Sequence, residues 1–278
     1  MIFEFRNIVR LARSESILSL MRRSFRYTYK FYFHFCFTVK AKKYGPDCEA
    51  NELMDFIFSG YHGLVRPMQV RSEIEALFNI LRARKPRFIL EIGTAFTGGT
   101  LFILSRAASR DATIISCDLP FGKFGGGYPV WKIPFFKSFA SHEQEIILVR
   151  ADSHAMPTLM QIKSFLKGNE LDVLFIDGDH TYDGVRKDFL MYSPLVKKTG
   201  LIIFHDIVPN TSDNCCKVSQ FWQEIKISNG YREIVQDWNQ GGFGLGLIIQ
   251  KSYNKVILSM PTAMMIGNEE SSSVREII

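Results

Sequence analysis

The chain has 278 residues, of which 46% are hydrophobic and 22% charged, and its formal net charge is +6. This length and composition can bury a sizeable core, which excludes a disordered tail and a disulfide-stapled mini-protein. The charge is unevenly placed. Residues 1–43 hold 10 basic and 2 acidic side chains, net +8, and the rest of the chain holds 24 and 26, net −2. The body therefore offers no basic excess for a polyanion, and we expect no nucleic-acid partner.

The cysteines and the apolar runs indicate the compartment. The five cysteines are an odd number and form no C-x-x-C pair, which favours a reducing environment. No stretch reaches the roughly 18 apolar residues of a membrane-spanning helix. The best short apolar run, Phe31–Val39, is followed by Ala41, Lys42 and Lys43 rather than by a small-residue cleavage site, which argues against a secretory signal. We expect a cytoplasmic protein and leave peripheral attachment to a membrane open.

The N-terminal arm has two patterns. Residues 8–21 place apolar side chains among arginines, as in a basic amphipathic helix. In residues 25–37 every odd position is aromatic, and this period of two predicts an extended strand. We expect the arm to contact another subunit or an anionic membrane, and the alternative is that its aromatic side chains cover an apolar patch of their own domain.

From about residue 68, short β-branched runs alternate with helical patterns, which is typical of a parallel sheet with crossover helices. We therefore predict an α/β protein with a Rossmann-like, doubly wound sheet of seven strands, mostly parallel and with an antiparallel C-terminal strand. The predicted organisation is an extension over residues 1–65, a domain over 66–255 and a tail over 256–278. The expected strands are Arg87–Ile92, Thr113–Cys117, Ile146–Arg150, Asp172–Ile176, Leu201–Phe204, Tyr231–Gln236 and Phe243–Ile249, and the expected helices are Val70–Arg84, Gly99–Ser109, Met156–Leu166, Val185–Val196 and Cys216–Ile227.

The first strand runs into a glycine-rich loop, because residues 90–100 read LEIGTAFTGGT. Gly93, Gly98 and Thr100 fit the phosphate-binding pattern G-x-x-x-x-G-K-[ST], but Gly99 replaces its lysine, which disfavours a nucleoside triphosphate. The loop also lacks the middle glycine of the dinucleotide pattern G-x-G-x-x-G. What fits is an acid at the strand end, Glu91, followed by small residues that could lie against a nucleoside carrying an amino acid. A turn with no ligand is the alternative.

The next two predicted strands also end in acids. Asp118 follows the second strand, where a carboxylate can accept hydrogen bonds from both ribose hydroxyls. Asp152 and Ser153 follow the third, and small polar residues there suit an adenine edge. Each acid by itself is more often a helix cap. Three such strand ends together indicate a nucleoside site.

These residues resemble a known family. The segment from Leu90 to Gly99, with Asp118 closing the next strand, resembles the cofactor site of class I S-adenosylmethionine-dependent methyltransferases. The segments 118–128, 176–188 and 204–207 resemble the subgroup that includes cephalosporin-hydroxylase-like and macrolide-sugar O-methyltransferases, and the likeness covers about residues 66–250. It implies S-adenosylmethionine as cofactor and a hydroxyl of a sugar, glycan or small secondary metabolite as acceptor. The expected cofactor contacts are Glu91, Gly93, Thr94, Gly98, Gly99, Thr100, Asp118, Asp152 and Ser153.

The fourth and fifth strands end in further acids. Adjacent parallel strands lie about 4.8 Å apart, so Asp177 and Asp206 can approach closely. Two carboxylates repel unless a cation lies between them, and oxygen ligands with open positions suit Mg²⁺, which would stabilise a developing alkoxide. His180 is the best available general base, because the pKa of imidazole lies near ambient pH. The resemblance implies the same acids and the same base.

His205 departs from the family pattern, because metal-dependent relatives usually have another acid there. We predict Asp177, His205 and Asp206 as ligands of Mg²⁺ or another divalent cation, with a softer donor set than usual. A buried histidine bonded to backbone is the alternative for His205. Two further alternatives stay open for the chain as a whole: a non-catalytic module that binds a partner or membrane, and a metal-independent N- or C-methyltransferase.

Overall fold

The structure is a computed structural model, and it describes residues 32–45, 48–122, 126–227 and 230–249. The predicted amphipathic helix at 8–21 and the C-terminal tail lie outside these ranges. So do the predicted aromatic positions up to Phe31.

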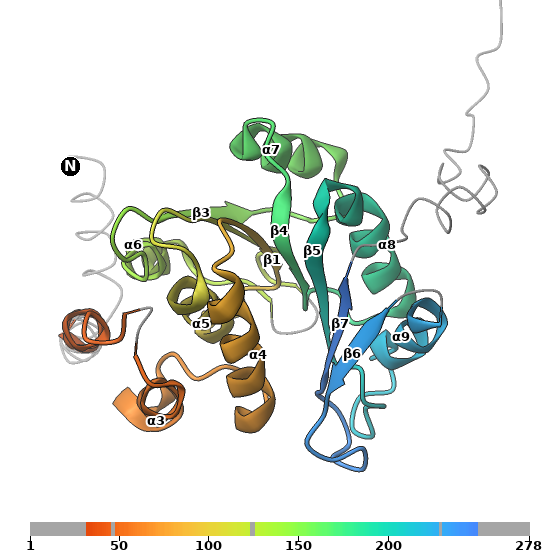
Figure 1. Cartoon of the computed structure of the whole chain (residues 1–278), viewed down its shortest axis with the longest axis horizontal. Coiled ribbons are helices and arrows are strands. Elements are labelled where there is room, and N and C mark those ends of the chain that lie inside the picture. The colour runs from red at the N-terminus through yellow and green to blue at the C-terminus, as the bar shows by residue number, and fades with distance from the viewer. Residues whose placement is uncertain (1–31, 46–47, 123–125, 228–229, 250–278) are drawn as a thin grey trace, which may run out of the picture.

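One seven-stranded sheet forms the centre of the protein, in the order β3-β2-β1-β4-β5-β7-β6 (Figure 1). The first five strands are parallel, β7 runs antiparallel to β5, and β6 runs antiparallel to β7. The predicted doubly wound sheet with an antiparallel C-terminal strand is therefore confirmed. The strands are β1 Phe88–Ile92, β2 Thr113–Asp118, β3 Glu145–Arg150, β4 Leu171–Ile176, β5 Val196–His205, β6 Tyr231–Ile234 and β7 Leu245–Ile249.

Helices cover both faces of the sheet because its strands are apolar on both sides. Successive side chains of a strand point to opposite faces. Ile89 and Phe175 accordingly join the hydrophobic core under α4 and α5, whereas Leu90 and Leu174 join the core under α7, α8 and α9. The helices are α3 Ala50–Ser59, α4 Arg71–Arg84, α5 Gly99–Ala107, α6 Ile133–Lys137, α7 Met156–Leu166, α8 Tyr182–Tyr192 and α9 Val218–Lys226, with short 3₁₀ turns at Gly60–Gly63, Val130–Lys132 and Ser193–Leu195.

Two predicted elements need corrected boundaries. The helix predicted over Val185–Val196 is α8, which starts at Tyr182 because the Thr181 side chain accepts a hydrogen bond from Gly184 N at 3.0 Å. It ends before Pro194, which belongs to the following 3₁₀ turn. Strand β5 then starts at Val196, five residues earlier than predicted.

The strand predicted for the aromatic arm is wrong where the structure describes it. Residues 32–41 are helical, and the buried positions His34, Phe37 and Ala41 are three and four residues apart, as on one face of a helix. The Phe37 ring packs against Phe56 and Phe102, with ring centroids 5.0 and 5.2 Å apart. This part of the arm thus covers an apolar patch of its own domain, and contact of residues 1–31 with a membrane or second subunit stays a prediction.

Two smaller expectations concern thiols and membrane spans. None of the five cysteines, all of which lie in the described ranges, forms a disulfide; Cys117 and Cys216 are buried and Cys215 is exposed. Among the helices that the structure describes, none has the length and apolar character needed to cross a bilayer.

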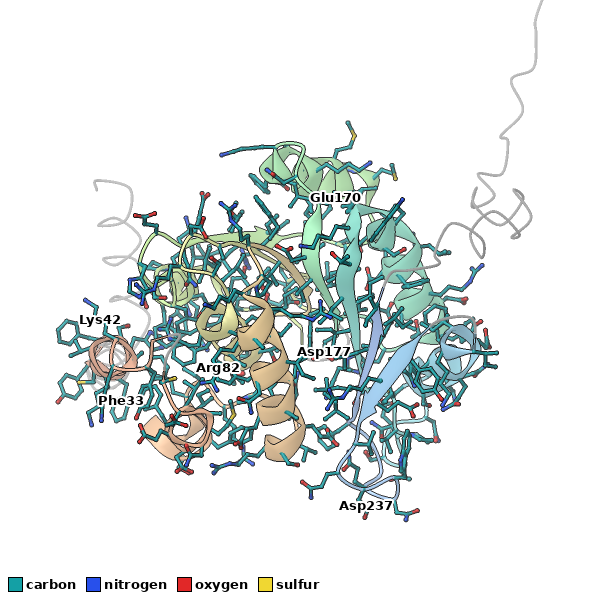
Figure 2. The ribbon with its side chains drawn as sticks, in the orientation of Figure 1. Phe33, Lys42, Arg82, Glu170, Asp177 and Asp237 are labelled. Atoms are coloured by element: carbon teal, nitrogen blue, oxygen red, sulfur yellow. The ribbon has the colours of Figure 1, made fainter. Side chains whose placement is uncertain are left out.

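Figure 2 shows Asp177 near the middle of the molecule, far from Lys42 and Asp237 at its ends.

Candidate active site

A cavity of about 200 Å³ lies at the carboxyl ends of the parallel strands. It spans the point where the strand order reverses, between β1 and β4, which is where doubly wound sheets bind ligands. Its walls come from the ends of β1, β2 and β4 and from the segment after β3. The lining residues include Gly93, Asp118, Leu119, Gly126, Ala151, Asp152, Ser153, His154, Asp177, Gly178 and Asp179.

Gly93 brings the ends of β1 and β4 together. Its φ is +98°, in the region that favours glycine, and a Cβ there would lie 1.9 Å from the carbonyl oxygen of Asp177. Two backbone hydrogen bonds hold this edge, from Gly93 N to Cys117 O and from Asp177 N to Ile92 O, both 2.8 Å. The glycine therefore sets the position of Asp177 as well as that of the loop.

Asp118 presents its carboxylate to the cavity. Its Oδ2 accepts a hydrogen bond from Ala95 N at 2.6 Å, and its Oδ1 accepts one from Gly127 N at 2.9 Å. Burial raises the pKa of this carboxyl above its usual value, although these backbone donors act in the opposite direction. The two amides fix the carboxylate at the end of β2 and leave further lone pairs for ligand hydroxyls.

The predicted cofactor residues divide into two groups. Gly93, Asp118, Asp152 and Ser153 line the cavity. Thr94, Gly98, Gly99, Thr100 and Glu91 are not among its lining residues.

The second group supports the loop from behind. A Cβ on Gly98 would meet the Phe136 ring at 2.7 Å, and one on Gly99 would meet the backbone of Pro67 at 2.4 Å. Thr100 Oγ1 accepts a hydrogen bond from the Gln69 side chain at 3.1 Å. These contacts explain the small residues by close packing at the start of α5.

Glu91 is fully buried beneath the loop. Ser116 donates a hydrogen bond to its Oε2, and Thr94 is bonded in turn to Ser116, whereas Glu91 Oε1 has no hydrogen-bond partner. Burial, with a smaller contribution from the charges of Asp118 and Asp177, raises the pKa of Glu91 to about 8. Glu91 is therefore mostly protonated near neutral pH in the cofactor-free protein.

The sequence reasoning missed His154. This residue lines the cavity directly after Ser153, and its Nε2 lies 3.2 Å from Oδ1 of the buried Asp188. The Asp188 carboxylate raises the pKa of His154 above its usual value, against the effect of burial. A histidine one position beyond a predicted adenine-contacting pair was the available signal.

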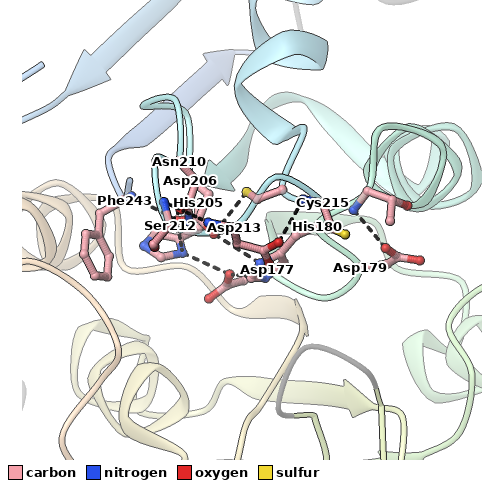
Figure 3. A network of polar contacts seen from close by, with 12 residues as sticks. Asp177, Asp179, His180, His205, Asp206, Asn210, Ser212, Asp213, Cys215 and Phe243 are labelled. Carbon is pink, nitrogen blue, oxygen red and sulfur yellow. Dashed lines mark hydrogen bonds and ion pairs between the residues drawn. The ribbon is translucent and has the colours of Figure 1, made fainter. Parts of the chain in front are cut away.

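A cluster of two acids and two histidines lies beside the cavity, at the ends of β4 and β5 (Figure 3). His205 Nδ1 lies 3.0 Å from Asp177 Oδ1 and 3.6 Å from Asp206 Oδ1. His180 lies 3.4 Å from Asp177 through Nε2 and 3.2 Å from Asp206 through Nδ1. The structure thus brings together the four residues predicted as base and metal ligands.

The cluster is electrostatically coupled. Burial by itself lowers the pKa of both histidines, but the neighbouring carboxylates outweigh it. They raise the pKa of His205 to about 9 and, together with a hydrogen bond between His180 and Cys216, that of His180 to about 11. The same histidines hold the pKa of Asp177 well below its usual range, although burial opposes this. Asp206 has a left-handed backbone, with φ of +62°, and its Oδ1 accepts a hydrogen bond from Phe243 N at 3.0 Å.

The donor atoms of this cluster could hold a cation. Among the described residues, Asp177, His205 and Asp206 each offer a ligand atom within 4.8 Å of the others. A second group, which the sequence reasoning did not anticipate, consists of His180, Asp206 and Cys216. Asp179 lies outside both groups, and its Oδ1 accepts a hydrogen bond from Thr181 N at 2.9 Å.

Comparison with known proteins agrees with this architecture. Residues 90–207 match a family described as methyltransferase domain. The chain is 16% identical in sequence to an O-methyltransferase from Bacillus cereus, solved in complex with SAH, with a TM-score of 0.51 and coverage of 71% of this chain and 90% of that one.

Two curated proteins also match. One is uncharacterized protein y4gI of Sinorhizobium fredii, 25% identical over 149 residues, which are 52% of this chain and 16% of that protein. The other is uncharacterized protein R132 of Acanthamoeba polyphaga mimivirus, 53% identical over 38 residues, or 14% of this chain and 17% of that protein. The matched parts span less than a fifth of the length of either curated protein.

The seven-stranded sheet is Rossmann-like and residues 90–207 match a methyltransferase domain, so the predicted resemblance to class I methyltransferases is confirmed. These residues contain the cavity and the acid–histidine cluster.

Proposed function

We propose that the protein is an S-adenosylmethionine-dependent O-methyltransferase. The observation that carries this proposal is the position of Asp177, which lines the cavity and also contacts both histidines of the cluster. A nucleoside cofactor in the cavity and a hydroxyl acceptor at the cluster would therefore meet at one side chain.

The cavity residues fit this cofactor. The Asp118 carboxylate can accept hydrogen bonds from the two ribose hydroxyls. Ala151, Asp152 and Ser153 form a small, polar wall on the β3 side, where an adenine edge can lie. The relative from Bacillus cereus was solved with SAH, which supports the same ligand class here.

The acid–histidine cluster supplies the acceptor chemistry. When S-adenosylmethionine is bound, it supplies a methyl group on a positively charged sulfur. A hydroxyl acceptor would take this methyl group on its oxygen and leave SAH, and His180 would receive the hydroxyl proton. Removal of that proton by a positioned base contributes about 10²–10⁴-fold to such reactions.

The same cluster could hold a divalent cation. Asp177, His205 and Asp206 would be its ligands, and the cation would supply positive charge next to the acceptor oxygen. A metal-independent arrangement is the second candidate, because His180 already lies between Asp177 and Asp206 and, when protonated, balances their charges. We propose a sugar or a small secondary metabolite as the acceptor.

The experiment that tests the function is an acceptor screen with the full chain. S-adenosylmethionine is incubated with sugars, glycosides and small phenols, and conversion to SAH and the methylated product are measured by mass spectrometry. We expect O-methylated product from the native chain, none from Asp177→Asn, and native yield from Asp183→Asn, which changes an exposed acid on α8. Transfer to nitrogen or carbon, or equal yields from both variants, would contradict the proposal.

A further inference from the structure

A thiol lies at the edge of the acid–histidine cluster, next to the Asp206 carboxylate. Cys216 is 5% exposed, and its Sγ lies 3.9 Å from Asp206 Oδ2. His180 Nδ1 approaches the same oxygen, at 3.2 Å. Nitrogen, oxygen and sulfur donors from three separate segments thus converge around one carboxylate oxygen.

We propose that His180, Asp206 and Cys216 form a binding site for Zn²⁺, distinct in its donor set from the oxygen-rich group of Asp177, His205 and Asp206. Thiolate and imidazole ligands select zinc over Mg²⁺, which prefers oxygen. Three protein ligands leave the fourth tetrahedral position open, as in catalytic rather than structural zinc sites.

The spacing of the donor atoms fits a tetrahedral ion. Zinc–ligand bonds of about 2.0–2.3 Å at tetrahedral angles place neighbouring donors about 3.3–3.8 Å apart. The observed separations from Asp206 Oδ2 are 3.2 Å to His180 Nδ1 and 3.9 Å to Cys216 Sγ. Both distances lie within a few tenths of an ångström of the tetrahedral values, and the donor atoms of His180 and Cys216 lie within 4.8 Å of each other.

The surroundings orient two of the ligands. Asp177 Oδ1 lies 3.4 Å from His180 Nε2, the nitrogen that faces away from the proposed zinc, and carboxylates in this position commonly orient metal-bound imidazoles. The segment that carries Cys216 is tied to the His180 loop by a backbone hydrogen bond of 2.7 Å from Lys217 N to His180 O. The ligands are thus held before any ion binds.

Zinc at this site has a consequence for catalysis. It would engage His180 and share Asp206 with the oxygen-rich group, so zinc binding and the role of His180 as base exclude each other. Only this consequence rests on the proposed function, because the ion can bind whether or not the protein transfers methyl groups.

Cobalt absorption tests the site directly, because Co²⁺ replaces zinc and reports thiolate ligation through a charge-transfer band in the near ultraviolet. We expect this band when the metal-free full chain is titrated with Co²⁺, and we expect Zn²⁺ but not Mg²⁺ to abolish it. Cys216→Ser should lose the band and bind Zn²⁺ at least about tenfold more weakly, since loss of an outer-shell partner alone costs 10–100-fold. Cys215→Ser, at the exposed neighbouring thiol, is the matched control and should keep the band.

Two further variants protect the test against misfolding and separate it from the proposed function. Cys216→Ala should behave as Cys216→Ser does, and metal-free circular dichroism should show that both variants keep the native fold. Asp177→Asn disables the oxygen-rich group but should keep the charge-transfer band with weakened affinity. Absence of the band from the native chain would overturn the proposal, as would a band that survives in the Cys216 variants and disappears in Cys215→Ser.

Discussion

His180 lies between Asp177 and Asp206, with Nε2 3.4 Å from one carboxylate and Nδ1 3.2 Å from the other. The sequence argument for a metal assumed that only a cation could hold these two acids together. A protonated imidazole is such a cation, and the two carboxylates, together with a hydrogen bond between His180 and Cys216, raise the pKa of His180 to about 11 despite burial. His180 can therefore serve as a base only when other positive charge balances the acids and lowers its pKa.

Removing the imidazole should slow the reaction without weakening cofactor binding. We expect His180→Ala to lower the rate of methyl transfer by about 10²–10⁴-fold, because the acceptor loses its base. His142→Ala, at an exposed histidine between α6 and β3, is the control and should keep the native rate. Initial rates with saturating S-adenosylmethionine give the comparison, and a native rate for His180→Ala would contradict the assignment.

Removing divalent cations decides between the two forms of the mechanism. We expect excess chelator to abolish methyl transfer and added Mg²⁺ to restore it, because charge beside the acceptor oxygen would be lost and regained. The measurement is the rate before chelation, after it and after Mg²⁺ is added. Full activity in chelator would show that the reaction needs no divalent ion. It would favour the metal-independent arrangement, in which protonated His180 balances the charges of Asp177 and Asp206.

Glu91 should make the cofactor-free protein less stable as the pH rises. Its pKa is about 8 in the folded protein against 4.5 for an exposed glutamate, so between these values the folded state keeps a proton that the unfolded chain has released. Stability should therefore fall between about pH 4.5 and 8, by up to about 1.4 kcal/mol per pH unit from this group. Urea denaturation across this range should show the fall in the native chain and a shallower one in Glu91→Gln.

The exposed Glu143 provides the control for that experiment. Glu143→Gln should keep the native pH dependence, because this side chain is exposed and lies apart from Glu91. Identical slopes for the native chain and Glu91→Gln would show that Glu91 is ionised in the folded protein.

Gly93→Ala should be strongly destabilising, because its Cβ would collide with the Asp177 carbonyl oxygen. Gly168→Ala is the matched control: its φ of +85° is also positive, but nothing lies within 4 Å of a Cβ there. We expect the free energy of unfolding to fall by about 1–2 kcal/mol in Gly168→Ala, from backbone strain alone, and by more than about 4 kcal/mol in Gly93→Ala. Equal losses of unfolding free energy would show that the loop relaxes away from Asp177.

The features that the sequence predicts best are the strands, from their hydrophobic periodicity, and the acidic residues at the strand ends. Buried β-branched runs placed the parallel strands, and Asp118, Asp177 and Asp206 then followed at one edge because the carboxyl ends of parallel strands meet there. The pairing of His180 with both acids could not be read from the chain. It depends on how the loop after β4 folds back over the end of β5.

The aromatic arm shows how a pattern can mislead. Alternating aromatic residues at Phe33, Phe35 and Phe37 suggest a strand, but a helix buries only Phe37 of these, together with His34 and Ala41. Packing of Phe37 against Phe102 of α5, 65 residues later in the chain, stabilises the helix. Cys216 was missed for a similar reason, since its approach to Asp206 is a tertiary contact that spacing does not reveal.

Calorimetric titration of the full chain with S-adenosylmethionine and SAH is the most direct test of the central claim. We expect saturable binding of one molecule per chain, weakened at least about tenfold by Asp118→Ala, since each hydrogen bond to a charged acceptor is worth about 1.5–3 kcal/mol. Asp111→Ala is the control and should leave the affinity unchanged, because Asp111 pairs with Arg87 at the amino ends of β1 and β2, opposite the cavity. Absence of binding by the native chain, or unchanged affinity in Asp118→Ala, would contradict the assignment of this cavity as the cofactor site.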